Sequence, residues 1–269
     1  MPSDTTRLDV ALVDRGLARS RTRAGELIAA GAVSVDGQTV TKASARVSSD
    51  HDLVVSGNGD RWVGRAAGKL VGAFEAFDLD ARGRRCLDIG ACTGGFTQVL
   101  LEQGADHVIA LDVGHDQLAP EISLDPRVED RSGTTVRGLT PDDIGGPVDL
   151  VVGDLSFISL RLVLAEIAGL LTDTGEAVLL VKPQFEVGRG RVGRRGVVTT
   201  PEAREEAIIS VLEVAADVGL SVLDLAASPV RGTEGNREYL VHLTRRRDVG
   251  TTWQHHRVTI SDLAREEAP

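Results

Sequence analysis

Two lysines and two carboxylates stand beside landmarks in the sequence and form a set that can do chemistry: Lys69, Asp154, Lys182 and Glu238. Asp154 and Lys182 each end an apolar run typical of a buried strand. Glu238 opens another such run, and Lys69 ends the stretch 64–69. Strand ends of an open α/β sheet face the crevice where ligands bind. We therefore expect the four side chains to meet in one catalytic site.

The chemistry that suits this set is methyl transfer to a ribose hydroxyl. A ribose 2′-hydroxyl is a poor nucleophile and must lose its proton as its oxygen attacks the methyl carbon. A partly desolvated lysine near a second cation has a lowered pKa, so it can accept that proton or stabilise the alkoxide. The carboxylates would orient the two lysines. Alignment of the hydroxyl oxygen, the methyl group and the sulfur would supply much of the rate.

A glycine-rich loop between two of these landmarks favours S-adenosylmethionine as the cofactor. Residues 88–97 read DIGACTGGFT, in which glycines let the backbone approach a ligand and a helix start presents free N–H groups. The spacing is not Gly-x-Gly-x-x-Gly, and Asp88 would repel a pyrophosphate but attract an ammonium, so a dinucleotide is disfavoured. Asp112 ends the next strand, where it can accept hydrogen bonds from ribose. The candidate cofactor contacts are Asp88, Gly90, Ala91, Thr93, Gly94, Gly95, Phe96, Asp112 and Asp154; no metal site is expected.

Other methyl acceptors fit the sequence less well. Methylation of an exocyclic base nitrogen favours an Asp/Asn-Pro-Pro-aromatic turn after the fourth strand, whereas residues 154–157 read DLSF. Methylation at pyrimidine C5 needs a cysteine nucleophile, and neither Cys86 in a buried strand nor Cys92 in the glycine loop is placed for it. A ribose oxygen therefore remains the favoured acceptor.

The region 65–269 alternates strand-like and helix-like segments, which predicts an α/β fold with a doubly wound, Rossmann-like, largely parallel sheet. The expected strands lie at 86–88, 108–112, 149–154, 177–182, 221–226 and 239–244. The expected helices include 96–103, 160–171 and 202–218. The resulting domain is of the methyltransferase type.

The first 59 residues predict a separate small α+β module, joined by a linker at 60–64. Two helix-like segments flank an arginine-rich turn, with Ser20 as an N-cap and Gly31 ending the second helix. Residues 33–40 read VSVDGQTV, a strong signal for a hairpin with a tight Asp-Gly turn. This arrangement resembles the S4 family of RNA-binding modules. Basic side chains at a turn and a helix start can contact phosphates.

Bulk properties narrow the setting in which the protein works. The net charge of −10 disfavours indiscriminate binding to nucleic acid, but arginines cluster near predicted functional elements. The N-terminus lacks a secretory signal pattern, no apolar run is long enough to span a bilayer, and the two cysteines suggest no disulfide framework. We expect a cytoplasmic monomer with no membrane contact. The candidate RNA-binding residues are Arg7, Arg19, Arg21, Arg23, Arg65, Arg189 and Arg191.

Together these features resemble the TlyA family of ribosomal RNA cytidine 2′-O-methyltransferases, which are also known as haemolysins. The resemblance spans nearly the whole chain, as an S4 domain followed by an FtsJ-like methyltransferase domain. Its motifs are the glycine loop, DLSFISL at 154–160, VKPQFE at 181–186 and GNREY at 235–239. The resemblance implies S-adenosylmethionine dependence, 16S and 23S ribosomal RNA in the ribosomal subunits as substrates, and a catalytic tetrad of Lys69, Asp154, Lys182 and Glu238.

Three departures from the family pattern keep two alternatives open. The family's Ser-Arg-Gly-x-x-Lys-Leu reads GRAAGKL at 64–70, so Gly64 lacks a hydroxyl. The family's Glu-Arg-Thr-Asn reads SGTT at 132–135, and His115-Asp116 replaces the usual pair after Asp112. Weakened cofactor binding would suit a non-catalytic RNA-binding or ribosome-assembly factor with a relic methyltransferase domain. A membrane-active haemolysin is the other alternative, which the acidic balance disfavours.

Overall fold

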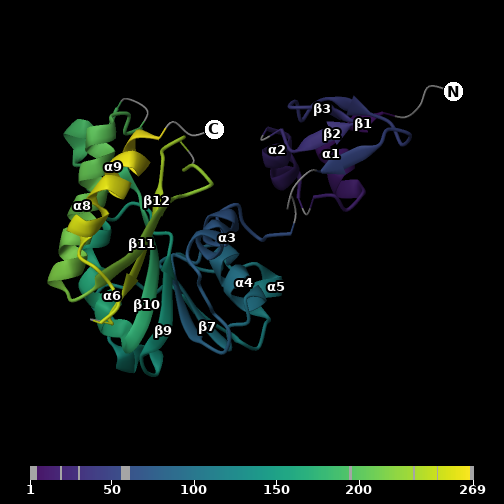
Figure 1. The fold of residues 1–269 in the computed structure, drawn as a ribbon. Helices are drawn as coiled ribbons and strands as arrows, with labels where there is room; N and C mark the ends of the chain where they lie inside the picture. The colour runs from purple at the N-terminus through teal and green to yellow at the C-terminus, as the bar shows by residue number, and fades with distance from the viewer. Residues whose placement is uncertain are drawn as a thin grey trace. The chain divides into compact units, whose positions relative to one another are not determined.

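The structure, a computed structural model, describes residues 5–18, 20–29, 31–55, 61–193, 196–232, 234–246 and 248–266. The chain divides into two compact units, Met1–Val63 and Gly64–Pro269 (Figure 1). The boundary falls at the end of the segment 60–64 that the sequence suggests as a linker. Each unit has a hydrophobic core of its own, so each is described by itself.

The N-terminal unit contains the expected helix, turn, helix and hairpin. Its elements are β1 (Thr6–Arg7), α1 (Leu8–Asp14), α2 (Arg21–Ala29), β2 (Val33–Val35), β3 (Gln38–Thr39), β4 (Arg46–Val47) and β5 (Leu53–Val55). The Ser20 hydroxyl accepts a hydrogen bond from the Arg23 N–H at 3.1 Å, as an N-cap should. Strands β2 and β3 are joined by Asp36 and Gly37, which both have positive φ, as a type I′ turn requires.

The C-terminal unit is built on a seven-stranded sheet. Its strands are β6 (Arg85–Ile89), β7 (His107–Asp112), β8 (Val128–Ser132), β9 (Val148–Gly153), β10 (Leu171–Val181), β11 (Ser221–Ala227) and β12 (Tyr239–Thr244). Their order is β11-β12-β10-β9-β6-β7-β8, and the five strands from β10 to β8 are parallel. Only β12 runs antiparallel to its neighbours. The sequence did not predict β8, because this edge strand reads VEDRS and has almost no apolar side chains.

Helices cover both faces of this sheet (Figure 1). They are α3 (Ala67–Ala76), α4 (Gly95–Glu102), α5 (Pro120–Ser123), α6 (Leu164–Leu170), α7 (Pro183–Glu186), α8 (Pro201–Asp217) and α9 (Arg257–Arg265). Short 3-10 turns η1 (Pro141–Ile144), η2 (Leu160–Leu162), η3 (Arg189–Arg191) and η4 (Trp253–His256) complete the unit. In Figure 1, α3 and α4 lie on one side of the sheet and α6, α8 and α9 on the other.

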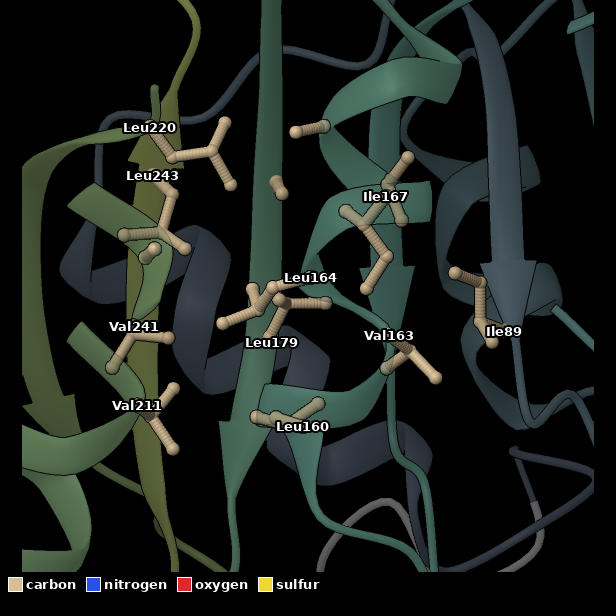
Figure 2. Packing of buried hydrophobic residues seen from close by; sticks show 14 of the residues in the cluster. Ile89, Leu160, Val163, Leu164, Ile167, Leu179, Val211, Leu220, Val241 and Leu243 are labelled. Atoms are coloured by element: carbon tan, nitrogen blue, oxygen red, sulfur yellow. The ribbon is translucent and has the colours of Figure 1, made fainter. Parts of the chain in front are cut away.

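Alternation along the strands separates an apolar face from a face that carries polar groups. Leu87, Ile89, Leu179, Val241 and Leu243 point toward α6 and α8 and belong to the main core, which Figure 2 shows from close by. The residues between them along β6, β10 and β12 point to the opposite face. That face is the one covered by α3 and α4, so the polar side chains at its edge lie beneath these two helices.

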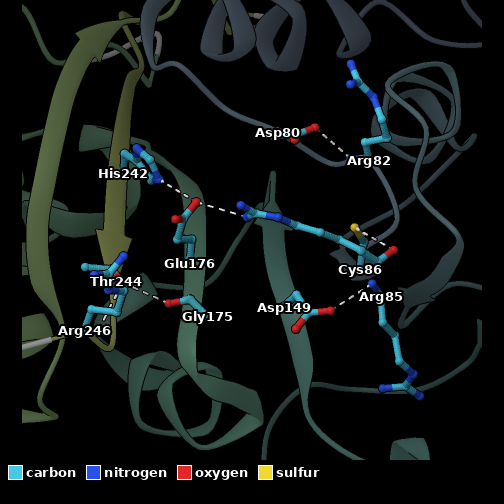
Figure 3. A network of polar contacts seen from close by, with 11 residues as sticks. Asp80, Arg82, Arg85, Cys86, Asp149, Gly175, Glu176, His242, Thr244 and Arg246 are labelled. Carbon is cyan, nitrogen blue, oxygen red and sulfur yellow. Dashed lines mark hydrogen bonds and ion pairs between the residues drawn. The ribbon is translucent and has the colours of Figure 1, made fainter.

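A partly buried polar network supports this face toward the amino ends of the parallel strands (Figure 3). Glu176, in the middle of β10 where its continuous pairing with β9 begins, accepts a hydrogen bond from Arg84 at 3.2 Å and contacts the His242 ring at 3.3 Å. The His242 ring stacks on Phe77, the residue that ends α3, with 5.4 Å between ring centroids. The C-terminal end of α3 is therefore anchored to the sheet, and its first turn lies toward the opposite, carboxyl edge.

Candidate active site

The four residues expected to be catalytic lie at the carboxyl edge of the parallel strands. Asp154 follows the last residue of β9, and Lys182 follows the last residue of β10, which pairs with β9. Glu238 immediately precedes β12, and because β12 is antiparallel its start lies at the same edge, with Val181 opposite Tyr239. Lys69 comes from the first turn of α3 above them.

The structure brings these four side chains into one chain of contacts. Lys69 Nζ lies 2.9 Å from Asp154 Oδ2 and 2.6 Å from Glu238 Oε2. Lys182 Nζ lies 2.6 Å from Asp154 Oδ1 and donates a hydrogen bond to Ser156 Oγ at 2.8 Å. Asp154 thus bridges the two lysines, one with each oxygen. Two positive and two negative formal charges share a site of low exposure without a net charge.

Burial makes these ion pairs stronger than pairs at the surface. Lys69 and Lys182 are each 6% exposed and Glu238 is 3% exposed. Burial by itself would raise the pKa of Asp154, but attraction to Lys182 and Lys69, together with their hydrogen bonds, outweighs it and holds the pKa below its ordinary value. Asp154 is consequently an anion at neutral pH and can orient both amines.

The four side chains border a cavity of about 700 Å³. The glycine loop forms one wall of it and the loops after β9 and β10 form the others. Among the expected cofactor contacts, the lining includes Gly90, Ala91, Thr93, Gly95, Phe96 and Asp154. Further lining residues include Arg65, Ser156, Phe157, Gln184, Phe185 and Asn236. The catalytic candidates and the glycine loop therefore face the same space.

The glycine loop needs its glycines for backbone and for packing reasons. Gly90 has a φ of +83°, and a Cβ there would lie 3.2 Å from the Asp154 carbonyl oxygen. Gly94, the N-cap of α4, has a φ of +91°, and a Cβ on it would lie 2.9 Å from Ile122. Gly94 faces Ile122 and is not among the residues that line the cavity, so the structure shows a packing reason for glycine at this position.

Asp88 and Asp112 support the loop from beneath and are not among the residues that line the cavity. Asp88 is fully buried and accepts a hydrogen bond from the Thr97 hydroxyl at 2.7 Å. Burial, only partly offset by Thr97, raises its pKa to about 7. Asp112 accepts hydrogen bonds from the backbone N–H groups of Cys92 at 2.9 Å and Gly114 at 2.8 Å. Strand-end position alone did not reveal that backbone donors hold the Asp112 carboxylate or that a side-chain hydroxyl holds Asp88.

Many of the arginines expected to bind RNA are paired with carboxylates. Arg7 and Arg21 both contact Asp9, at 2.8 and 3.2 Å, and leave much of their side chains exposed. Arg23 pairs with Glu26 and Arg191 pairs with Glu206. Arg65 belongs to the cavity lining. Arg19 and the Arg189 side chain lie outside the described part of the chain.

Three polar residues that organise the site lie inside the sequence motifs named above, but the sequence did not predict a role for them. Ser156 accepts the Lys182 hydrogen bond described above. Asn236, 2% exposed, accepts from the Val198 N–H at 2.9 Å and donates to the Gly196 carbonyl at 2.8 Å, which ties the loop after η3 to the segment before Glu238. Glu186 holds the loop after β9. All three lie inside the motifs 154–160, 181–186 and 235–239, and this membership was the one indication in the sequence that they could belong to the site.

The departures from the family pattern also have local explanations. A Cβ at Gly64 would lie 2.5 Å from Thr93 Oγ1, so the missing hydroxyl leaves room for Thr93 to pack against this segment. A Cβ on Gly133, whose φ is +76°, would overlap the His115 ring. His115 and Gly133 therefore depend on each other, because the ring occupies the space that a side chain at 133 would need.

Comparisons with known proteins agree with this geometry. Residues 62–245 match the FtsJ-like methyltransferase family and residues 6–53 match the S4 domain. The 16S/23S rRNA (cytidine-2′-O)-methyltransferase TlyA of Mycobacterium tuberculosis is 51% identical over 90% of this chain and 91% of its own. The 23S rRNA (cytidine-2′-O)-methyltransferase TlyA of Campylobacter jejuni is 35% identical over 67% of this chain and 70% of its own. A solved structure from Streptococcus thermophilus with a hemolysin name superposes with a TM-score of 0.76 at 35% identity, covering 97% of this chain and 94% of the other.

Proposed function

The chain, an S4 domain followed by an FtsJ-like methyltransferase domain, belongs to the TlyA family, and we propose that it methylates the 2′-hydroxyl of cytidine in 16S and 23S ribosomal RNA. The observation that carries the proposal is the bridge from Lys69 through Asp154 to Lys182, closed by Glu238, beside the glycine-loop cavity. Two amines and two carboxylates in that order are the groups that ribose deprotonation needs.

The residues around the cavity fit S-adenosylmethionine as the cofactor. Gly90 and Gly95 line it and leave the loop backbone open to a ligand, and α4 begins at Gly95 with backbone N–H groups at the loop. Asp154 and Glu238 add carboxylate oxygens at the same cavity as possible hydrogen-bond acceptors. When bound, S-adenosylmethionine supplies a methyl group activated by a sulfonium.

The contacts of the two lysines distinguish their roles. Lys69 is held between two carboxylates and positions both Asp154 and Glu238. Lys182 shares Asp154, but its second partner is the neutral hydroxyl of Ser156. We assign to the Lys182 Nζ atom, as the neutral amine, the acceptance of the proton from the ribose hydroxyl, which leaves an ammonium, and to Asp154 the orientation of that amine.

The choice of lysine at these positions supports this assignment. The chain has 30 Lys and Arg residues, and Lys42, Lys69 and Lys182 are its lysines. Arginine supplies the positive charge at every other such position, although it cannot release a proton at the pH of the cell. Two of the three lysines meet in the cavity, where an exchangeable proton matters. At the position of Lys182, to which the proton is assigned, a purely electrostatic role would have been served by arginine.

Ribosomal RNA as the partner is supported by the S4 domain and by the relatives. The N-terminal unit presents Arg7 and Arg21 with much of their side chains exposed, as phosphate contacts require. Both rRNA species are part of the proposal because the M. tuberculosis relative is named for both. Such a substrate implies action in the cytoplasm. All four catalytic groups come from one chain, which is compatible with a monomer.

The two alternative functions lack a favouring observation. A relic domain would have little reason to keep four ionisable groups paired beside an open cavity. For the haemolysin alternative, within the described ranges we find no helix with the length and apolar content needed to cross a bilayer. The hemolysin name of the S. thermophilus structure is a property of that protein.

The decisive experiment measures transfer of labelled methyl from S-adenosylmethionine to ribosomal subunits that lack 2′-O-methylation. The parent protein should label a cytidine ribose, and Lys182→Ala should reduce the rate at least ~100-fold. Lys182→Arg retains the charge but cannot accept a proton, so it should be equally inactive while cofactor binding persists. Full transfer by Lys182→Arg would contradict the proton-acceptor role. No transfer by the parent, with no cofactor binding, would favour the relic.

A further inference from the structure

The loop that follows β9 holds its catalytic residues in a backbone conformation that is unfavourable on its own. Phe157 has a φ of +65°, in the left-handed region that costs a non-glycine residue on the order of 1 kcal/mol. Its ring is 92% exposed, so burial of the side chain does not offset this cost. Other contacts must hold this loop, which carries Asp154 at its start and Ser156 beside Phe157.

The bracing contacts come from one short segment, 182–186. Lys182 donates to Ser156 Oγ at 2.8 Å, and the Phe185 ring lies against the Phe157 ring with 5.4 Å between centroids. Pro183 opens α7, a single helical turn, and the Phe185 N–H donates to the Lys182 carbonyl at 2.9 Å. Lys182 is thus rigidly connected to the residues that follow it.

Glu186, at the end of the same turn, makes the most extensive of these contacts. Its carboxylate accepts hydrogen bonds from the Ser159 hydroxyl at 2.5 Å, the Leu160 N–H at 2.8 Å and Arg161 Nε at 3.3 Å. Its carbonyl oxygen accepts a further bond from Arg161 Nη2 at 3.1 Å. The Glu186 side chain is 1% exposed, so these donors replace the water that a buried carboxylate would otherwise need.

The position of Glu186 has a consequence for Lys182. Both acceptors of the Lys182 amine, Asp154 and Ser156, belong to the loop whose far end Glu186 holds. The segment 182–186 therefore contributes two groups. Lys182 supplies the amine, and Glu186, four residues later, holds the loop that carries the two acceptors of that amine. Glu186 is not among the residues that line the cavity and its side chain is 1% exposed, so we place it behind the site and not in contact with a ligand.

We propose that Glu186 is a positioning residue for methyl transfer: it fixes the loop 154–160 so that Ser156 and Asp154 together aim the Lys182 amine at the substrate hydroxyl. Ser156 is the member of the loop through which the effect reaches Lys182. The inference rests on the proposed function, since it concerns the same site. It adds to the four catalytic groups the buried carboxylate of Glu186, on which the geometry of those groups depends.

The test is Glu186→Gln in the full chain, with Glu213→Gln as a matched control at an exposed position of α8. Glutamine retains one acceptor oxygen but cannot serve both Ser159 and Leu160. We expect kcat for ribosomal RNA to fall ~10- to 100-fold, while KM and the Kd of S-adenosylmethionine change less than about threefold. Backbone amides at 156–160 should exchange hydrogen faster with solvent. Glu213→Gln should match the parent in kcat, in KM, in the Kd of S-adenosylmethionine and in the rate of hydrogen exchange.

Two further variants keep the test decisive if Glu186→Gln folds poorly. Ser159→Ala removes one donor and should lower kcat about 3- to 10-fold with normal cofactor binding. Ser156→Ala removes the hydrogen bond from the loop to Lys182 and lowers kcat by itself. If Glu186 acts through Ser156, adding Glu186→Gln to this variant should lower kcat little further, whereas the fold-losses of two independent effects would multiply. Parental kcat in Glu186→Gln and Ser159→Ala, or equal losses of kcat and cofactor affinity, would overturn the proposal. Absence of transfer by the parent and by Glu213→Gln would instead overturn the proposed function.

Discussion

Lys69 Nζ and Asp154 Oδ2 lie 2.9 Å apart although 85 positions separate the two residues in the sequence. Lys69 comes from the first turn of α3 and Asp154 from the end of β9, so this contact joins a covering helix to the sheet beneath it. The other oxygen of the same carboxylate holds Lys182. A single residue therefore sets the distance between the two amines.

Removing the charge of Glu238 should slow catalysis and leave the cofactor bound. Glu238 contacts Lys69 at 2.6 Å and is 3% exposed, so Glu238→Gln leaves Lys69 with Asp154 as its one carboxylate partner. Lys69 then competes with Lys182 for Asp154, and we expect methyl transfer to fall ~10- to 100-fold, or about 1.4 kcal/mol per tenfold. Single-turnover kinetics with saturating cofactor measure this. An unchanged rate would remove Glu238 from the catalytic set.

Asp88 should make stability depend on pH in a defined window. Burial raises its pKa in the folded protein to about 7, from an ordinary value of 3.8. The folded state therefore binds this proton more tightly, and the resulting stabilisation is present below pH 3.8 and is lost as the pH rises through about 7. The loss amounts to roughly 4 kcal/mol at most. Asp154, whose pKa is lowered, has the opposite effect and loses stabilisation as the pH falls below 3.8.

Asp88→Asn isolates this contribution, because an amide can still accept the Thr97 hydrogen bond but does not titrate. Urea unfolding of both proteins at constant ionic strength, between pH 4.5 and 8 in steps of about half a unit, gives the difference in unfolding free energy. The parent should lose stability relative to Asp88→Asn as the pH rises. A difference that is independent of pH would show that Asp88 is ionised throughout, which its full burial disfavours.

Two glycine-to-alanine substitutions in helices should have opposite effects on stability. A Cβ on Gly72 of α3 would lie 2.5 and 2.7 Å from the Pro229 ring, so Gly72→Ala should cost ~1–3 kcal/mol by overpacking. Gly169 of α6 has nothing within 4 Å of such a Cβ, and Gly169→Ala should stabilise by up to ~1 kcal/mol. Thermal unfolding of the two variants and the parent measures both changes in stability. Because Gly72 is one turn from Lys69, its variant should also transfer methyl more slowly.

Asn236 should couple the arginine-rich loop to the site. Asn236→Ala leaves the Val198 N–H and the Gly196 carbonyl without their side-chain partner, which costs on the order of 2 kcal/mol where these groups stay buried. We expect faster hydrogen exchange at Val198 and slower methyl transfer. Thr200→Ala, which removes only the cap of α8, is the matched control. Unchanged protection at Val198 would show that other contacts hold the loop.

The N-terminal unit should contribute to RNA affinity through charge. Arg21 is 63% exposed and shares Asp9 with Arg7. If Arg21 contacts one phosphate, Arg21→Gln should weaken binding to ribosomal RNA and lower the slope of log K against log salt by about 0.7–0.9. Filter binding over a salt series measures the slope. Arg257→Gln, at an exposed position of α9, should leave it unchanged.

The sequence by itself determined the order of elements and the motifs. Apolar runs before Asp154 and Lys182 revealed β9 and β10, because buried parallel strands are apolar on both faces. The Asp36-Gly37 hairpin was confirmed because its turn requires residues that accept positive φ. Strand β8 was not predicted, since an edge strand of charged residues has no such pattern.

Only the tertiary structure decided which side chains meet and what each one faces. Asp88 and Asp112 read as cofactor ligands from their strand-end positions, and the structure adds that Thr97 donates to one Asp88 oxygen and that the backbone N–H groups of Cys92 and Gly114 donate to the two Asp112 oxygens. Conversely, Ser156, Glu186 and Asn236 had no assigned role until their partners were visible. The physical reason is that strand and helix periods are local, whereas hydrogen-bond partners across loops depend on the packing of segments far apart in the chain.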